Sequence, residues 1–297
     1  MKYTYYPGCS LETSSRMYDS SLREVFAHLG LELVELPDWN CCGATAYFSI
    51  KETVSLSVSA RNLAIAEQLG YDVVAPCASC FTILMKTHRT MQQNSELRGN
   101  INEALQSVGL SYQGKVKIRH PLEVLLTDVG LDVLRQQVVQ PLKGMNIAPY
   151  YGCQIARGEA TFDNAENPIF MDQLFHALGA TISYYPNKVR CCGGMLMYTF
   201  EEVALRMCAD LMRCALENGS NAIATTCPMC HANLDLHQEK LQEMDPRMQT
   251  IPIYFFTQLI GIALGISTKK LGLDLHHIQP NGALKNILHT QKEVAYV

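Results

Sequence analysis

Three short stretches decide the fold: Pro7-Gly8-Cys9, Asn40-Cys41-Cys42-Gly43 and Pro76-Cys77-Ala78-Ser79-Cys80. They return in the same order as Tyr151-Gly152-Cys153, Arg190-Cys191-Cys192-Gly193-Gly194 and Cys227-Pro228-Met229-Cys230. The first copy reads C-x31-CC-x34-C-x2-C and the second C-x37-CC-x34-C-x2-C, and ten of the 12 cysteines belong to the pattern. The chain is therefore a duplication built around two sets of five thiols.

The duplication divides the 297 residues into two expected domains of ordinary size, 1–145 and 146–297. Hydrophobic residues make up 48% of the chain and charged residues 18%, a composition that excludes a disordered protein. The net charge of -4 provides no basic surface for a phosphate backbone. We therefore expect no nucleic-acid partner.

No stretch of the sequence indicates export or a membrane span. The N-terminus lacks a basic segment followed by an apolar one, so no secretory signal is expected. The most apolar late run, Ile251 to Gly265, is shorter than the roughly 20 residues that cross a bilayer, and we expect a buried strand and helix there. Because clustered thiols stay reduced in the cytoplasm, we expect a cytoplasmic protein.

Short apolar runs alternate with helical periodicity throughout the chain. The expected strands are Lys2–Tyr6, Leu31–Leu36, Asp72–Ala75, Val116–Arg119, Asn146–Tyr150, Thr181–Tyr185, Ala222–Thr225 and Ile251–Phe255. The expected helices are Leu11–Leu29, Val54–Leu69, Phe81–Met91, Pro168–Leu178, Glu201–Glu217 and Ala232–Gln242. The tail after Ser267 is less patterned, and we expect it to wrap over a neighbouring surface. This alternation predicts an α/β fold of two pseudo-symmetric domains, each a mainly parallel sheet flanked by helices.

Four of the cysteines come where a strand ends and a helix begins: Cys9, Cys77, Cys153 and Cys227. Ligands of open α/β sheets gather at the carboxyl ends of the strands. The N–H groups and the positive dipole end of a helix stabilise thiolates there. Neighbouring glycines such as Gly8 and Gly152 let the backbone approach bulky sulfur. The sequence therefore predicts twin metal sites.

Five thiols a site constrain what is bound. Zinc takes four ligands, which leaves one cysteine of each half without a role. Ordinary cubane clusters also take four cysteines, typically in compact runs that are absent from this sequence. Five cysteines with an adjacent pair suit an iron–sulfur cluster of unusual shape, in which neighbouring thiolates reach different irons or one sulfur bridges two of them. Zinc in at least one half and structural disulfides remain the alternatives.

The duplicated pattern resembles the cysteine-rich CCG domain, and a pair of such domains in a chain of this size is similar to the B subunit of heterodisulfide reductase. The resemblance runs from Tyr6 to about Phe256. It implies two noncubane [4Fe-4S] clusters, with a disulfide cleaved reductively between them. By position, one cluster falls to Cys9, Cys41, Cys42, Cys77 and Cys80, and the other to Cys153, Cys191, Cys192, Cys227 and Cys230.

The sequence has neither a dinucleotide fingerprint nor a ferredoxin-type cysteine run, so we expect the chain to depend on partners for its electrons. The resemblance implies that these partners are the small, ferredoxin-like C subunit and the flavin-containing A subunit of the complex. It also implies a small disulfide or thiol as substrate, with a disulfide such as CoM-S-S-CoB reductively cleaved or reversibly formed. The alternatives are a non-catalytic electron-transfer subunit of a glycolate-oxidase- or succinate/fumarate-reductase-like assembly, and an interaction module without redox chemistry.

Side chains next to the motifs have two interpretations each. His231 follows Cys230 and is either a proton donor to a leaving thiolate or a packing residue at a helix start. The resulting C-x-x-C-H run also matches haem attachment, but its first-half counterpart carries Phe81 in place of the histidine. Lys188 and Arg190 form either a basic edge for an anionic substrate or an ordinary solvated surface.

Overall fold

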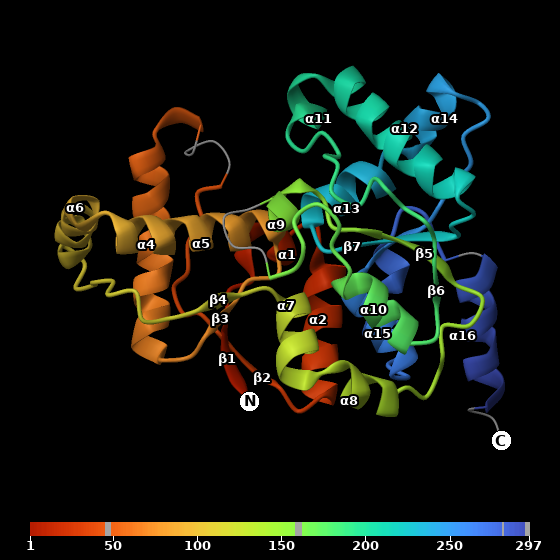
Figure 1. The fold of residues 1–297 in the computed structure, drawn as a ribbon, viewed down its shortest axis with the longest axis horizontal. Helices are drawn as coiled ribbons and strands as arrows, with labels where there is room; N and C mark the ends of the chain where they lie inside the picture. The colour runs from red at the N-terminus through yellow and green to blue at the C-terminus, as the bar shows by residue number, and fades with distance from the viewer. Residues whose placement is uncertain (45–48, 158–161, 281, 295–297) are drawn as a thin grey trace.

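The structure, a computed structural model, describes residues 1–44, 49–157, 162–280 and 282–294, and it is the α/β fold that the sequence predicts (Figure 1). Each half contains one four-stranded parallel sheet, with the order β2-β1-β3-β4 in the first and β6-β5-β7-β8 in the second. The strands are β1 (Lys2–Tyr5), β2 (Glu32–Glu35), β3 (Val73–Val74), β4 (Ile118–Arg119), β5 (Asn146–Tyr150), β6 (Thr181–Ile182), β7 (Ala222–Thr225) and β8 (Ile253–Phe255). The two sheets therefore share one topology.

Helices connect and flank the strands of both sheets (Figure 1). Those of the first half are α1 (Gly8–Glu12), α2 (Arg16–His28), α4 (Glu52–Leu69), α5 (Ala78–Gln93), α6 (Ser95–Gln106), α7 (Pro121–Val124), the π-helical turn η1 (Leu125–Val129) and α8 (Leu131–Gln136). Those of the second half are α9 (Cys153–Arg157), α10 (Phe170–Ala177), α11 (Leu196–Thr199), α12 (Glu201–Glu217), α13 (Pro228–Asp235), α14 (Gln238–Met244), α15 (Phe256–Ala263), the 3-10 turn η2 (Leu273–Leu275) and α16 (Gly282–Val294).

Two of the expected helices are each broken into two. The stretch Leu11–Leu29 is α1 and α2, because the Thr13 hydroxyl donates to the carbonyl of Cys9 at 2.8 Å and the backbone turns there. Such a local side-chain bond competes with the helical ladder. The stretch Ala232–Gln242 likewise belongs to α13 and α14. The first break lets α1 carry Cys9 in one direction while α2 runs along the core in another.

Several elements were not predicted from the sequence. Helix α6 begins after Asn94, whose side chain accepts from the backbone N–H of Leu97 at 2.9 Å, so an N-cap asparagine was the available signal. The tail after Ser267 includes α16, and the carbonyl of Ile287 in that helix accepts from Gln140 at 2.7 Å. The strand expected at Thr181–Tyr185 pairs only as far as Ile182.

The two halves pack into one another through α2 and α15. The ring of Tyr18 on α2 stacks on Phe255 with a centroid separation of 4.3 Å. The hydroxyl groups of Ser21 and Thr257 form a buried hydrogen bond of 2.7 Å across the same contact. Buried side chains of both halves therefore belong to one continuous hydrophobic core. The boundary between residues 145 and 146 stays a prediction, and β5 begins directly after it.

Candidate functional site

The cysteines lie at the switch points of the two sheets. In each sheet the chain leaves the first strand to one neighbour and later returns on its other side, so the order reverses between β1 and β3, and between β5 and β7. Cys9 follows β1 and Cys77 follows β3, and the second half repeats this placement with Cys153 after β5 and Cys227 after β7. A crevice at the carboxyl ends of the strands is where open α/β sheets bind ligands.

The structure brings the five thiols of the first half together. Cys41 interacts with the side chains of Cys9 and Cys42, and Cys80 interacts with those of Cys42 and Cys77. The five sulfur atoms therefore form a chain of neighbours in the order 9, 41, 42, 80 and 77. The adjacent pair 41 and 42 links the cysteine after β1 to the pair after β3.

The second half repeats the same order of contacts. Cys191 interacts with Cys153 and Cys192, and Cys230 interacts with Cys192 and Cys227. The sulfur atoms of Cys192 and Cys230 are 3.5 Å apart. Each half thus gathers the thiols that the sequence assigns to it, and none of the ten is left outside its set.

Glycine and tyrosine residues form an equivalent cradle beside each set. Gly8 has φ +71°, and a Cβ there would lie 3.0 Å from the Cys80 sulfur; Gly152 has φ +72° and the same 3.0 Å approach to Cys230. The hydroxyl of Tyr6 donates to the carbonyl that precedes the adjacent pair, and Tyr150 does the same in the second half, both at 2.8 Å. A side chain larger than hydrogen at either glycine would therefore push into the space of the sulfur atoms.

Because the thiols of each set lie so close together, their pKa values differ strongly from one cysteine to the next. Hydrogen bonds from Cys42 and Cys9 and the backbone N–H of Gly43 lower the pKa of Cys41 to about 2. The equivalent bonds from Cys153 and Cys192 and the N–H of Gly193 lower the pKa of Cys191 to about 2.

For other cysteines of each set the pKa is shifted upward instead. The pKa of Cys80 and that of Cys230 are raised by the thiols beside them and by burial. Five thiolates cannot coexist in this space without cations. The donor set therefore fits a cationic metal–sulfur group held by five sulfurs.

The space between the two sets is lined by aromatic side chains from both halves. The Tyr18 hydroxyl donates to the carbonyl of Pro76 at 3.2 Å. Burial and the charges of Cys77 and Cys227 raise the pKa of Tyr18, so the hydroxyl is within electrostatic reach of both thiol sets. The two sets therefore lie on either side of a shared interface and not on separate faces.

His120 lies at the same interface. Its Nδ1 accepts from the backbone N–H of Leu122 at 3.1 Å, so Nε2 carries the proton and donates to the carbonyl of Pro76 at 3.0 Å. A further hydrogen bond joins the ring to the backbone of Thr226. The residues before the two C-x2-C pairs are thus held by one imidazole, and burial lowers its pKa to about 3.

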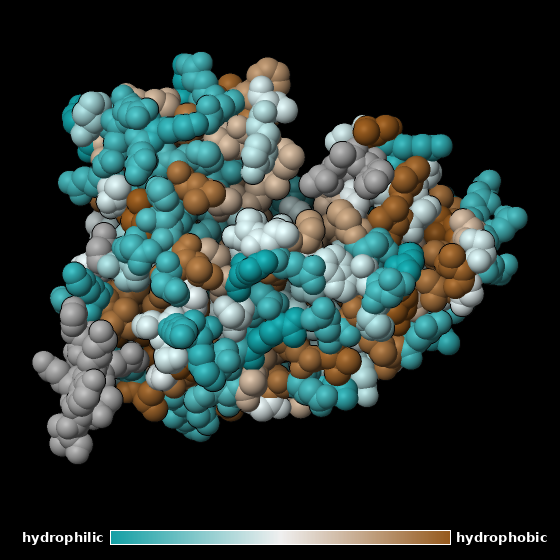
Figure 2. All heavy atoms as spheres, turned by 180° about the vertical axis from the view of Figure 1, so that it is seen from behind, coloured by the Kyte–Doolittle hydropathy of each residue, from teal (hydrophilic) through white to brown (hydrophobic). Residues whose placement is uncertain are grey.

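A hollow opens on the surface close to this interface. Figure 2 shows it between the part of the molecule that carries α11 and α12 and the part that carries the start of α4. Helices α1 and α9, which begin at the first cysteine motif of each half, lie between those parts in Figure 1. Cys9 is exposed, and Cys41, Cys153 and Cys191 are partly exposed. The thiols of each set that are reachable from solvent are therefore its first cysteine and the first cysteine of its adjacent pair.

Several functional neighbours were missed by the sequence analysis. Asn233 donates from Nδ2 to the Cys192 sulfur at 3.6 Å, and also to the Gly194 carbonyl at 3.0 Å. Tyr18 and His120 lie between the halves, but neither belongs to a cysteine motif in the sequence. The one available signal was position, since Asn233 follows the second cysteine of its pair by three residues on one helix.

The other predicted residues have structural contacts. Lys188 is buried and donates to Asp172 at 2.5 Å and to the carbonyl of Pro168 at 3.0 Å, so both expectations for it, a substrate-facing edge and a solvated surface, are wrong. His231 is 3% exposed and stacks on Phe255 with a centroid separation of 4.4 Å. Its Nε2 lies 3.1 Å from Nδ1 of His276.

The chain matches the cysteine-rich CCG domain over residues 3–85 and again over 147–235. It belongs to the CCG domain family. Both matched ranges contain one complete set of five thiols. The family and the relatives of the chain make it an oxidoreductase subunit of the iron–sulfur, electron-transfer class.

Among its relatives is the 8-methylmenaquinol:fumarate reductase membrane anchor subunit of Wolinella succinogenes, 31% identical over 92% of this chain and 95% of the relative. A protein of Archaeoglobus profundus, named as like the B subunit of heterodisulfide reductase, is 32% identical over 91% of this chain and 93% of the relative. In contrast to the name of the first, no helix in the described part of this chain has the length and apolar character to cross a membrane.

A solved structure of a hypothetical protein from Helicobacter pylori has the same fold. It superposes with a TM-score of 0.77 over 94% of this chain at 17% sequence identity. The chain spans 52% of the length of that protein. The likeness therefore establishes the repeated fold and nothing about activity.

Proposed function

We propose that this chain is the catalytic subunit of a heterodisulfide-reductase-type complex, which reductively cleaves, or reversibly forms, a disulfide such as CoM-S-S-CoB. The observation that carries the proposal is the closeness of the thiol sets, since the hydroxyl of Thr82, two residues after Cys80, donates at 3.0 Å to the carbonyl of Gln154, the residue after Cys153. Cleavage of a disulfide takes two electrons and two protons. Two redox sites that border one space can deliver both electrons to one substrate.

The residues that would hold the two noncubane [4Fe-4S] clusters of this proposal are the two sets of five thiols. They are Cys9, Cys41, Cys42, Cys77 and Cys80 in one half, and Cys153, Cys191, Cys192, Cys227 and Cys230 in the other. When bound, such clusters supply the electrons and an iron position that binds sulfur. The sharing of protons within each set, and the glycine cradles, support this assignment.

The chain's own aromatic residues hold the two sites in place and exclude water between them. His120 binds the residues before both C-x2-C pairs, and its ring stacks on Phe162 at a centroid separation of 5.8 Å. Phe81 packs edge-on against both rings, at 5.8 Å from His120 and 6.1 Å from Phe162. Packed aromatic rings of this kind exclude water. Electrostatic interactions at the neighbouring thiols are therefore stronger, and protons from solvent are kept away from the reacting groups.

His231 is the candidate proton donor of this proposal because it follows Cys230 directly. Its contacts with Phe255 and His276 favour the packing role instead. The variant His231→Gln, with iron content unchanged, separates the two roles. Loss of turnover together with a shifted pH profile supports proton donation, whereas unchanged turnover and profile remove His231 from the reaction.

We place the chain in a cytoplasmic complex with the ferredoxin-like C subunit and the flavin-containing A subunit. The relatives support partners of some kind, since both are named as subunits of reductases or as similar to them. A specific observation favours a second candidate function, a non-catalytic electron-transfer subunit. The Wolinella succinogenes relative is named for a fumarate reductase, a complex whose substrate contains no disulfide.

The experiment uses the full chain, purified without oxygen and reduced by an artificial one-electron donor. Addition of CoM-S-S-CoB should oxidise about two equivalents of donor for each disulfide cleaved. The variants Cys41→Ser and Cys191→Ser should each abolish cleavage, because one site is lost. Cys214→Ala, a thiol of α12 outside both sets, is the matched control and should retain it. Donor oxidation by a quinone or flavin acceptor with no thiol product would select the electron-transfer function.

A further inference from the structure

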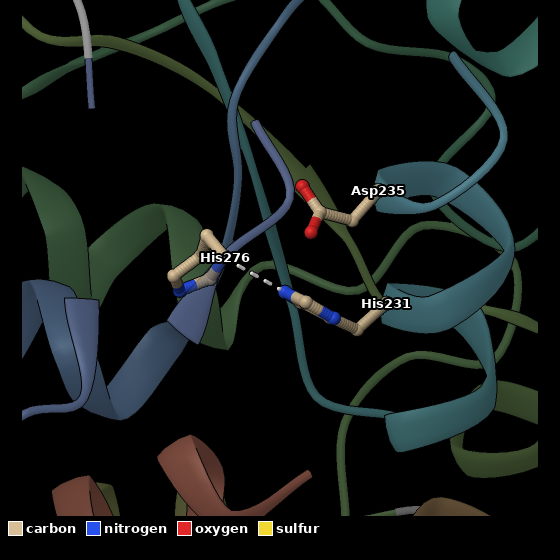
Figure 3. A group of neighbouring side chains, drawn as sticks. All are labelled: His231, Asp235 and His276. Carbon is tan, nitrogen blue, oxygen red and sulfur yellow. Dashed lines mark hydrogen bonds between the residues drawn. The ribbon is translucent and has the colours of Figure 1, made fainter. Parts of the chain in front are cut away.

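A second group of metal-ligating side chains lies in the second half, outside the ten thiols. His231 and Asp235 lie four residues apart on α13, and His276 follows the 3-10 turn η2. Figure 3 shows the three side chains turned toward one another. One ligand atom from each lies within 4.8 Å of the others, and all three residues are buried. From this geometry we propose that His231, Asp235 and His276 bind a divalent transition-metal ion, with zinc the best match.

The tautomer of His276 leaves a lone pair directed at the group. Gln258 donates from Nε2 to the carbonyl of Leu271, and its Oε1 accepts from the backbone N–H of Phe255, so its amide orientation is set. His276 Nε2 therefore donates to Gln258 Oε1 at 3.0 Å, and Nδ1 is unprotonated. Metal-binding histidines typically orient themselves in this way, with the second ring nitrogen donating to a fixed oxygen.

The distance between the two histidines suits a shared ion. His276 Nδ1 lies 3.1 Å from His231 Nε2. Zinc–nitrogen bonds of about 2.0–2.1 Å around a tetrahedral ion place two nitrogen ligands roughly 3.3 Å apart. The two nitrogen atoms therefore need to separate only slightly to bind one ion.

Asp235 brings a negative charge that has no cationic partner. It is 1% exposed, and its carboxylate oxygens accept from the backbone N–H groups of His277 and Ile278 at 2.8 and 3.3 Å. Among the described residues, no salt bridge includes it. A buried carboxylate without a cation is costly, and burial raises its pKa to about 6. A bound cation removes that cost.

A buried hydroxyl group, that of Tyr254, also supports an ion at this position. Tyr254 is fully buried, its ring packs edge-on against His276 at 5.4 Å, and its hydroxyl has no hydrogen-bond partner in the described part of the chain. The charge of Asp235 adds to burial in raising the Tyr254 pKa, so the hydroxyl is near that carboxylate. A hydroxyl placed there can hydrogen-bond to a water molecule on the ion. That water would be the fourth ligand, beside the three protein ligands.

The first half supplies an internal comparison. At the positions equivalent to His231 and Asp235, 150 residues earlier, it has Phe81 and Met85, which cannot bind an ion of this kind. The ion would therefore belong to the second half alone. It would tie the helix that carries Cys230 to the segment at His276. A ligated His231 cannot donate a proton, so the inference also replaces the proton-donor role with a structural one.

The direct test is anomalous X-ray scattering from crystals of the full chain, prepared without oxygen and with iron present so that the thiols are occupied. Data collected above and below the zinc edge should give a peak about 2 Å from His231, Asp235 and His276. The absence of a peak there at the zinc, iron, manganese, cobalt, nickel and copper edges overturns the proposal. The result then indicates a hydrogen-bonded histidine pair alone.

Metal content provides the second measurement. We expect one zinc for each wild-type chain, a loss of at least ten-fold in His276→Gln and Asp235→Asn, and no loss in His277→Gln, the neighbouring histidine whose side chain faces Glu239. Equal zinc in all four proteins overturns the proposal. Iron and zinc are counted separately, so failure of the thiol sites is distinguishable from failure of this one. If the variants do not fold, the anomalous scattering of the wild-type protein at the metal absorption edges still shows whether the ion is present.

Discussion

The two thiol sets are alike in their sulfurs and different in what surrounds them. Both have the same order of contacts, the same glycine at positive φ and the same tyrosine beside it. One turn along the helix that carries the C-x2-C pair, however, the first half has Phe81 and Ile83 where the second has His231 and Asn233. The common strand–helix frame therefore dictates the geometry of the thiols, and the helix behind them gives each site its own environment.

The two halves also contribute different residues to the interface between them. The residue before α7 in the first half is His120, and the equivalent residue before α15 in the second half is Phe255. His120 stacks on Phe162 and Phe255 stacks on Tyr18, so each half contributes one ring to each stacked pair. The polar ring is thus placed on one side of the pseudo-symmetry axis only. The two halves therefore share one strand–helix frame and differ at individual positions within it.

The largest expected effect comes from removing one sulfur from either thiol set, which tests whether the two sets bind equivalent groups. Cys41→Ser and Cys191→Ser should each lose about half of the iron of the full chain, since each set holds its own group. The measurement is iron content together with visible and electron paramagnetic resonance spectra without oxygen. Loss of all iron from either variant would instead show that the two sites assemble only together.

The glycine cradles offer the next largest effect. Gly8→Ala and Gly152→Ala should each destabilise the protein by about 2–3 kcal/mol, because a positive φ costs about 1–2 kcal/mol and the new Cβ meets a sulfur as well. Gly70→Ala is the matched control, since Gly70 has φ +74° with nothing within 4 Å of a Cβ. Thermal unfolding of the three variants measures the difference. Equal losses in all three would mean that the sulfur contact is without cost.

His120→Phe makes the first half resemble the second and should flatten the dependence of stability on pH. The pKa of His120 is lowered to about 3, below the usual value near 6.5. The unfolded chain then binds a proton between these values that the folded chain does not, so the contribution is present above about pH 6.5 and is lost as the pH falls toward 3.

Between pH 7 and pH 5 the wild type should therefore lose about 1–2 kcal/mol more of its free energy of unfolding than His120→Phe loses. Denaturant titrations at both pH values give the comparison. His176→Phe, at an exposed histidine, controls for removal of an imidazole. A pH dependence identical in wild type and His120→Phe would contradict the buried neutral ring.

The smallest effect concerns the reduction potentials. Asn233→Ile gives the second half the residue that the first half has at position 83, and removes the donor to the Cys192 sulfur. Hydrogen bonds to sulfur stabilise the reduced, more negative state, so the potential of the second site should fall by about 20–60 mV. Redox titration followed by spectroscopy measures both sites in one sample, and the first site is the control. A fall in the first potential, or none in the second, contradicts the assignment.

The sequence predicted much of this molecule because the relevant signals are local or periodic. The alternation of apolar runs with helical periodicity predicted two parallel sheets, and the repeated spacing predicted which thiols each half brings together. It was wrong about Lys188, whose partner Asp172 comes from a separate helix. It also missed the break between α1 and α2, where one threonine hydroxyl redirects the chain.

The amino-acid sequence by itself determined the two sets of five cysteines and their place at strand ends, because both depend on distances along the chain and on the periods of strand and helix. Tertiary structure alone decided what lies between and beside those sets. Tyr18 meets Phe255, and His231 meets His276, only because α2 packs on α15 and the chain after η2 folds back on α13. Such contacts depend on how whole elements pack, and no local pattern encodes that.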